Sequence, residues 1–184
     1  MKELSILELF ILSCIDRGLT TPYLMQREGG LSLGATSPTL PKLVKLGLVH
    51  RSAEKTSTNR PRHEYALTKE GKQQAKLGWK GHLESSTTPS DLDALLRLID
   101  LATSNGAAAA QLAELVKRAA KSRANMAERC SLEASELKSV MTGSYRAAKA
   151  KLDCLRYHAE AEGLASLASE IVKQHSSRKS KQRK

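Results

Sequence analysis

The feature that most constrains the fold of this chain is a change of hydrophobic period at Gly47. Before it, apolar residues recur every three or four positions in three short blocks, which is the spacing of amphipathic helices. After it, "LVHRSA" and "RHEYAL" alternate between apolar and polar residues, with the polar segment "EKTSTNRP" between them. The sequence therefore predicts three short helices followed by a two-stranded hairpin with a charged tip.

Proline and glycine mark where the first two helices begin and end. Apolar residues at helical spacing cover residues 3–17, and Gly18 stands where a left-handed cap would end that helix. In "TTPYLMQREGG", Thr21 is a typical N-cap and Pro22 suits the first helical position. A short second helix is therefore predicted to end before Gly29.

The third helix is predicted from "GATSPTLPKLVKLGLV". We expect Ser37 as its N-cap, Pro38 as its first helical residue and Gly47 just beyond its end. Pro41 then falls in the first turn, where a missing N–H costs little, so the helix is expected to begin irregularly. After the hairpin, Thr68 is predicted to cap a further helix.

Three short helices and a basic hairpin follow the winged helix-turn-helix plan. In that plan the third helix enters the DNA major groove and the hairpin, called the wing, lies along the backbone or the minor groove. Arg60 and Arg62 flank Pro61, which stiffens the end of the wing. We expect both arginines to contact phosphate; the alternative is an ordinary solvated turn.

The third helix supplies the other expected DNA contacts. Lys42 and Lys45 lie on its polar side, and Thr36, Ser37 and Thr39 lie near its N-terminal end, where base or phosphate contacts are made. We expect Thr39 and Lys42 to help discriminate base pairs. The complete predicted DNA-binding set is Thr36, Ser37, Thr39, Lys42, Lys45, Lys55, Arg60 and Arg62.

Residues 5–80 resemble the PadR-like transcriptional regulators, a family within the broader MarR-like winged helices. The resemblance rests on "RPRHEYALTKEG" in the wing, on the glycine, proline and leucine positions of "GATSPTLPKLVKLGLV", and on Tyr23 in the second helix. This chain departs from the family at Ser37, where a tyrosine is usual, and at Pro41. The resemblance implies a bacterial DNA-binding regulator, expected to be a repressor, with C-terminal helices that build a homodimer.

The basic charge is unevenly distributed. The net charge is +11, which favours polyanionic partners, and the excess lies in residues 1–80 and in the acid-free segment 173–184. Residues 81–172 are balanced, as a packing or dimerisation region would be. We expect a DNA-binding domain at 1–80, a helical dimerisation or effector domain at 90–172, and a disordered basic tail at 173–184.

The C-terminal half is predicted to be helical throughout. Helices are expected over 90–106, with Ser90 as the cap, and over about 107–129. A heptad seam then follows, which we interpret as the dimer contact, although an intramolecular bundle contact would give the same pattern. The seam residues are Met141, Tyr145, Ala148, Leu152, Leu155 and Ala159.

The fold class predicted overall is mostly α, an N-terminal winged helix-turn-helix with a β wing and a C-terminal all-helical domain. No phosphate-binding loop, nucleophile elbow or metal-ligand spacing is found, so we expect neither an enzyme nor a cofactor. The expected partners are double-stranded DNA, a second copy of the chain and a small-molecule effector of unidentified kind, with no membrane and a cytoplasmic location. The alternative functions are an architectural or replication-type DNA-binding protein and a winged helix used for protein interaction.

Overall fold

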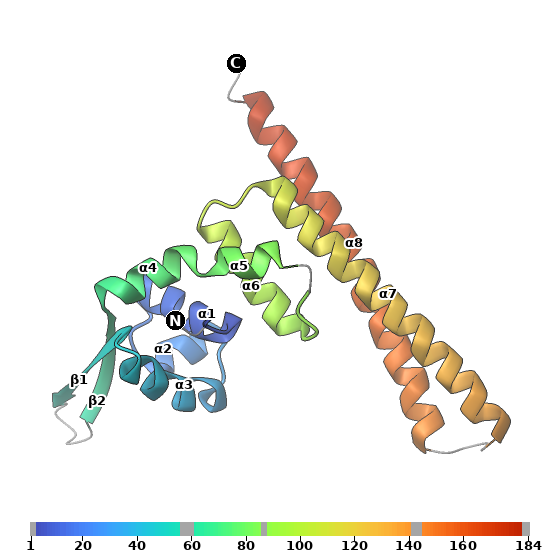
Figure 1. Ribbon diagram of the computed structural model, residues 1–184, viewed down its shortest axis with the longest axis horizontal. Helices are drawn as coiled ribbons and strands as arrows, with labels where there is room; N and C mark the ends of the chain where they lie inside the picture. The colour runs from blue at the N-terminus through green and yellow to red at the C-terminus, as the bar shows by residue number, and fades with distance from the viewer. Residues whose placement is uncertain (1–2, 56–60, 86–87, 141–144, 182–184) are drawn as a thin grey trace. The chain divides into compact units, whose positions relative to one another are not determined.

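The structure is a computed structural model that describes residues 3–55, 61–85, 88–140 and 145–181. Helices dominate, and the described strands form one two-stranded antiparallel sheet (Figure 1). The elements in chain order are α1 (Ile6–Asp16), α2 (Pro22–Arg27), α3 (Leu33–Lys45), β1 (Val49–Lys55), β2 (Pro61–Leu67), α4 (Lys69–Leu77), α5 (Trp79–Glu84), α6 (Leu92–Ser104), α7 (Ala109–Val140) and α8 (Tyr145–Lys181). They form two compact units: residues 1–85 with 90–106, and residues 86–89 with 107–184.

The first unit has the predicted three helices and hairpin in the predicted order. Ser5 caps α1 through a capping box with Glu8, and Thr21 caps α2, with Pro22 at the first helical position. The apolar faces of these helices, of α3 and of the hairpin meet in one core. Its fully buried members include Ile11, Leu12, Met25, Leu31, Leu40, Leu43 and Val49. This arrangement confirms the winged helix-turn-helix plan.

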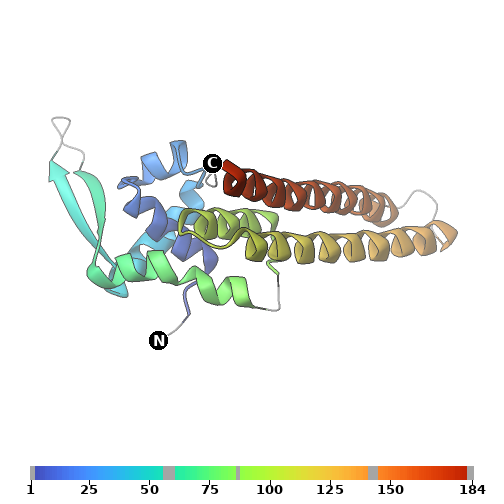
Figure 2. The same cartoon turned by 90° about the horizontal axis from the view of Figure 1, so that it is seen from above.

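The wing consists of β1 and β2, paired antiparallel from Val49 opposite Leu67 to Lys55 opposite Pro61. It projects from the helices of the first unit (Figure 2). Tyr65 is buried at its base, and the Tyr65 amide donates to the carbonyl of Thr20 at 2.9 Å. The base of the wing is thereby fixed to the segment before α2.

A close junction joins α3, the wing and α4. The Thr68 hydroxyl donates to the Gly47 carbonyl at 2.9 Å and accepts from the Gly71 amide at 3.0 Å. The Thr68 amide donates to the Leu48 carbonyl at 3.0 Å. Thr68 is thus the predicted N-cap of α4, and it also holds the turn that leads from α3 into β1. That turn contains Gly47 with φ of +70°, a conformation that side chains rarely adopt.

Residues 90–106 belong to the first unit, whereas we expected them to be part of a C-terminal helical domain. Their helix, α6, contacts α1 and α5 and buries Leu95, Leu98 and Leu101. Its N-cap is Asp91, one residue after the expected Ser90, and the Asp91 carboxylate accepts from the Ala94 amide at 3.1 Å. The apolar face of α6 completes the packing around α1.

The second unit is a long hairpin of α7 and α8, which run side by side in opposite directions (Figures 1 and 2). Both helices are longer than expected. Small side chains line the contact, among them Ala119 and Ala127 on α7 and Ala168 on α8. Buried Arg123 forms an ion pair with Glu160 at 2.8 Å across the hairpin.

The basic tail is corrected by the structure, because α8 continues as far as Lys181. Residues 173–181 contain neither glycine nor proline, and most of them are good helix formers. Adding residues to an existing helix is easy compared with starting one, so α8 extends into the segment that we expected to be disordered. No helix among the described residues is both long and apolar enough to cross a membrane.

Candidate nucleic-acid interface

The third helix begins five residues, or more than one turn, earlier than the sequence predicted. Its N-cap is Ser32, whose hydroxyl accepts from the Ala35 amide at 3.2 Å. Ser37, Pro38 and Pro41 therefore lie inside α3 and not at its start. Each proline removes one backbone hydrogen bond from the helix, so burial of the opposite face has to compensate for the loss.

Thr36 and Thr39 lie on the buried face of α3, which corrects the expectation that their side chains contact DNA. The Thr39 hydroxyl donates to the Ala35 carbonyl at 2.7 Å, and the Thr36 hydroxyl to the Ser32 carbonyl at 3.3 Å. Thr36 is fully buried and Thr39 is 8% exposed. Both hydroxyls therefore satisfy the backbone of their own helix.

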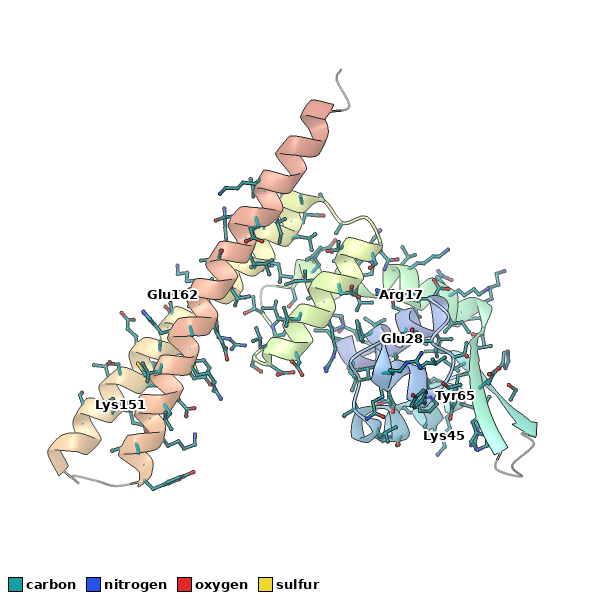
Figure 3. The ribbon with its side chains drawn as sticks, turned by 180° about the vertical axis from the view of Figure 1, so that it is seen from behind. Arg17, Glu28, Lys45, Tyr65, Lys151 and Glu162 are labelled. Atoms are coloured by element: carbon teal, nitrogen blue, oxygen red, sulfur yellow. The ribbon has the colours of Figure 1, made fainter. Side chains whose placement is uncertain are left out.

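The exposed face of α3 carries fewer polar side chains than expected. Its exposed residues after the first turn are Ser37, Pro38, Pro41, Lys42 and Lys45. Three of these were predicted DNA contacts, and the two prolines offer rings without donors. Lys45 lies in the last turn of α3, in the same unit as Tyr65 of the wing (Figure 3).

Lys42 forms an ion pair with Glu8 of α1. Glu8 is only 4% exposed, and one of its carboxylate oxygens also accepts from the Ser5 amide at 2.7 Å. Burial raises the pKa of the Glu8 carboxyl, but hydrogen bonds from Lys42 and Ser5 outweigh it and hold that pKa below its ordinary value. The main described contact of Lys42 thus fixes α3 on α1.

Replacing Lys42 with Met is expected to lower the free energy of unfolding by about 1–2 kcal/mol at pH 7, because Glu8 would be left buried without its cation. In the wild type the depressed pKa of Glu8 contributes stability above its ordinary value of 4.5, and this contribution is lost as pH falls. The difference between variant and wild type should therefore shrink from pH 7 to pH 3 in urea unfolding.

Lys45→Met is the matched control for this measurement, since Lys45 is an exposed lysine on the same helix. It should leave the unfolding free energy nearly unchanged at both pH values. An equal loss in the two variants, or a difference that stays constant with pH, would contradict the role given to the Glu8 pair.

The wing adds a basic residue that we did not single out in the sequence. Arg51 is exposed on β1, and its Nη2 atom lies 2.5 Å from Nε2 of His63 on β2. Lys55 and Arg62 lie at the far end of the paired strands, outside the described side chains, and Arg60 lies outside the described residues. Strand register alone could have placed Arg51 and His63 on one face.

Tyr23 of α2 is 61% exposed, so it is not a core residue. The guanidinium of Arg27 lies 5.3 Å from the centre of its ring. A surface hollow runs from α2 to the start of α3 and to the wing. It is lined by Thr21, Pro22, Tyr23, Gln26, Leu33 and His63. Polar and aromatic groups thus continue the exposed face of α3 toward the wing.

The predicted dimer seam lies on the exposed face of α8. Leu152 is 67% exposed, Leu155 60% and Tyr145 82%; Ala148 and Ala159 are also exposed, and Met141 lies outside the described residues. Among the α8 side chains that the structure describes, the buried ones are Ala150, Leu164 and Ala168, on the opposite side of the helix. The seam is therefore not the contact between α7 and α8, which corrects the intramolecular alternative.

Among the residues that the structure describes, no three His, Cys, Asp or Glu side chains gather as metal ligands would.

No family model and no curated protein matches this chain. Among solved structures, Bacillus subtilis PadR in complex with operator DNA aligns over 92% of this chain and 98% of its own, with 19% identity and a TM-score of 0.39. A protein from Streptococcus mutans UA159 aligns over 88% of this chain and 98% of its own, with 18% identity and a TM-score of 0.36. A PadR-like transcriptional regulator from Bacillus cereus aligns over 89% of this chain and 94% of its own, with 15% identity and a TM-score of 0.35. Likeness at this level carries no argument about what this chain binds.

Proposed function

We propose that this chain is a DNA-binding transcriptional regulator that reads duplex DNA with α3 and holds the DNA backbone with the wing. The observation that carries the proposal is the shared exposure of Lys45 on α3 and Arg51 on β1 in a winged helix-turn-helix unit. The net charge of +11 supports it, since phosphate contacts supply most non-specific affinity.

The proposed readout by α3 uses few side-chain hydrogen bonds. With Thr36 and Thr39 buried, Ser37 and Lys45 are the polar side chains of the exposed face that form no ion pair with another element in the part of the chain that the structure describes. Pro38 and Pro41 present apolar rings, which suit contact with thymine methyl groups more than polar base edges. Lys42 acts in this scheme mainly by positioning α3.

The direct test is selection of bound duplexes from a random library, followed by titration of the best sequence in increasing salt. A regulator should enrich one short site and bind it with a steep salt dependence. Binding that depends on the length of the duplex but not on its sequence would indicate an architectural protein. The absence of DNA binding would indicate a winged helix used for protein contacts, and either result would overturn the proposal.

Arg51→Ala is expected to weaken binding to specific and random duplexes alike, because a wing arginine contacts phosphate. The slope of log affinity against log salt should fall by about 1 unit. Lys151→Ala is the control, since Lys151 is exposed on α8 in the other unit (Figure 3). A loss confined to the specific site would instead assign base reading to Arg51.

The paired replacement of Arg60 and Arg62 by Ala tests the remainder of the wing. We expect a uniform loss of affinity and a salt slope that is lower by about 1 to 2 units, with unchanged sequence preference. Fluorescence anisotropy with one selected and one scrambled duplex measures both quantities. Full affinity in the folded double variant would remove these residues from the interface.

We further propose that the regulator is a homodimer joined through α8, acts on a roughly palindromic site and functions as a repressor. Leu152 and Leu155 are large apolar side chains exposed on one face of α8, and such a face favours burial against another surface. A twofold dimer would present two copies of α3 to successive major grooves about 34 Å apart.

A further inference from the structure

A pocket of about 400 Å³ lies in the first unit, beyond the C-terminal end of α3. It forms where the start of α1, the turn between α3 and β1, and one face of α4 meet. Its lining residues are Glu3, Leu4, Leu9, Leu46, Leu48, Glu70, Gln74 and Gly78. A volume of this size is within the range of small-molecule sites, roughly 300–1,000 Å³.

Glycine allows close packing of α4 against α1 at one wall of this pocket. Glu70, Gln74 and Gly78 follow one another at intervals of four residues, which places them along one face of α4 and its C-cap. A Cβ atom at Gly78 would lie 2.4 Å from Cδ2 of Leu9, so no side chain fits there. The floor is apolar, since Leu9 and Leu48 are buried and Leu46 is half-exposed.

The charged side chains on the pocket wall are both acidic. Glu3 and Glu70 are carboxylates, and no lysine or arginine is among the lining residues. Nε2 of His82 lies 4.0 Å from Glu3, but it also contacts the Leu4 carbonyl at 2.8 Å. In a chain with a net charge of +11, an apolar pocket edged only by acids complements a cation with an apolar body.

We propose that this pocket binds a lipophilic monocation, with its apolar body on the leucines and its charge between Glu3 and Glu70. Leu46 and Leu48 flank Gly47, so a bound cation touches the turn that sets the angle between α3 and the wing. Occupancy is therefore linked to DNA affinity, and this link rests on the proposed function. By linkage, DNA would change the affinity for the cation by the same factor.

The test titrates the full-length chain, without DNA, with methyltriphenylphosphonium in a calorimeter. Triphenylphosphine oxide has the same three rings and no net charge. We expect 1:1 binding of the cation, about 10-fold tighter than the oxide, because a carboxylate pair favours the positive charge. Equal affinity for the two probes, or binding that does not saturate, would overturn the proposal.

Variants locate the site. Glu3→Gln with Glu70→Gln should remove most of the preference for the cation, and Asp16→Asn, an exposed acid at the other end of α1, should retain it. Gln74→Trp should block both probes while the circular dichroism of the helices is retained. Wild-type binding in both pocket variants would place the cation elsewhere and refute the assignment.

The DNA link is tested separately. Operator affinity measured with and without saturating methyltriphenylphosphonium should differ by about 5-fold or more. Cation binding in a chain that does not bind DNA would retain the pocket and reject the proposed function. DNA binding without cation binding would retain the proposed function and reject the pocket. Cation binding that leaves operator affinity unchanged would reject only the link between the two.

Discussion

Replacing Leu152 and Leu155 with Glu is expected to convert the proposed homodimer to a monomer and to reduce operator affinity on the order of 100-fold or more. Both side chains are exposed within the chain, so the substitution should not disturb the contact between α7 and α8. Two carboxylates buried in an apolar contact would be unpaired, which is costly. Loss of the second binding module also removes the gain that a bivalent arrangement gives, typically 10²–10⁴.

Light scattering measures the loss of the dimer directly, as a fall in molar mass from about twice 20.1 kDa to 20.1 kDa. Lys151→Glu with His158→Glu is the matched control, since both residues are exposed on the neighbouring face of α8. The control changes the charge at least as much and should remain dimeric. A wild-type chain that is monomeric at micromolar concentration with full operator affinity would contradict the dimer.

Gly71→Ala is expected to destabilise the first unit by about 2–4 kcal/mol. A Cβ atom there would lie 2.0 Å from the carbonyl oxygen of Leu48, which is backbone and cannot rotate away. The substitution would otherwise favour a helix by about 1 kcal/mol, so helix propensity and packing act in opposite directions. The packing clash is the larger effect, so the variant should be less stable, because α4 would have to move away from the start of the wing.

Trp79 is the sole tryptophan and is buried in the first unit, so its fluorescence during urea unfolding reports on this unit. Gly34→Ala on α3 is the control, because a Cβ atom there meets only Ser32 Oγ at 3.8 Å. It should stabilise the unit slightly or leave it unchanged. Similar stability of Gly71→Ala and wild type would show that the junction tolerates movement.

Much of the first unit could be predicted because its signals are local. Gly18 and Gly47 both have positive φ at the helix ends where they were expected, and Thr68 caps α4 as predicted. The alternation of the wing strands also correctly predicted that they pair as a two-stranded hairpin. Each of these features depends on residues within a few positions of one another.

The start of α3 was mispredicted because two local signals compete. Ser37 followed by Pro38 has the composition of a helix start, yet Ser32 is an equally good cap five residues earlier. Burial of Thr36 favours the longer helix, and this burial depends on residues far away in the chain. Tertiary packing therefore determines where α3 begins, against the local preference for a start at Ser37.

The pair of Glu8 and Lys42 could not be inferred, because charge patterns do not reveal which helices will face each other. The α8 seam shows the opposite case. Leu152 and Leu155 are the larger apolar residues, so their spacing was easy to find, whereas the intramolecular contact uses inconspicuous alanines such as Ala150 and Ala168. Leu152 and Leu155 gave the clearer sequence signal although they do not pack in the hairpin, where Leu164 joins the alanines.

The ion pair of Arg123 and Glu160 has a consequence for how the α7–α8 hairpin can change in length. The guanidinium of Arg123 lies 5.8 Å from the ring centre of Tyr157, so two residues of α8 contact one buried side chain of α7. Sliding α8 by one heptad in the direction that brings Leu167 to the place of Glu160 would leave a buried charge without compensation, whereas the opposite slide would bring the shorter carboxylate of Asp153 there. A shift of α8 that brings Leu167 opposite Arg123 should therefore be excluded, whereas seven residues added to each helix beyond the pair should lengthen the hairpin and preserve its alignment.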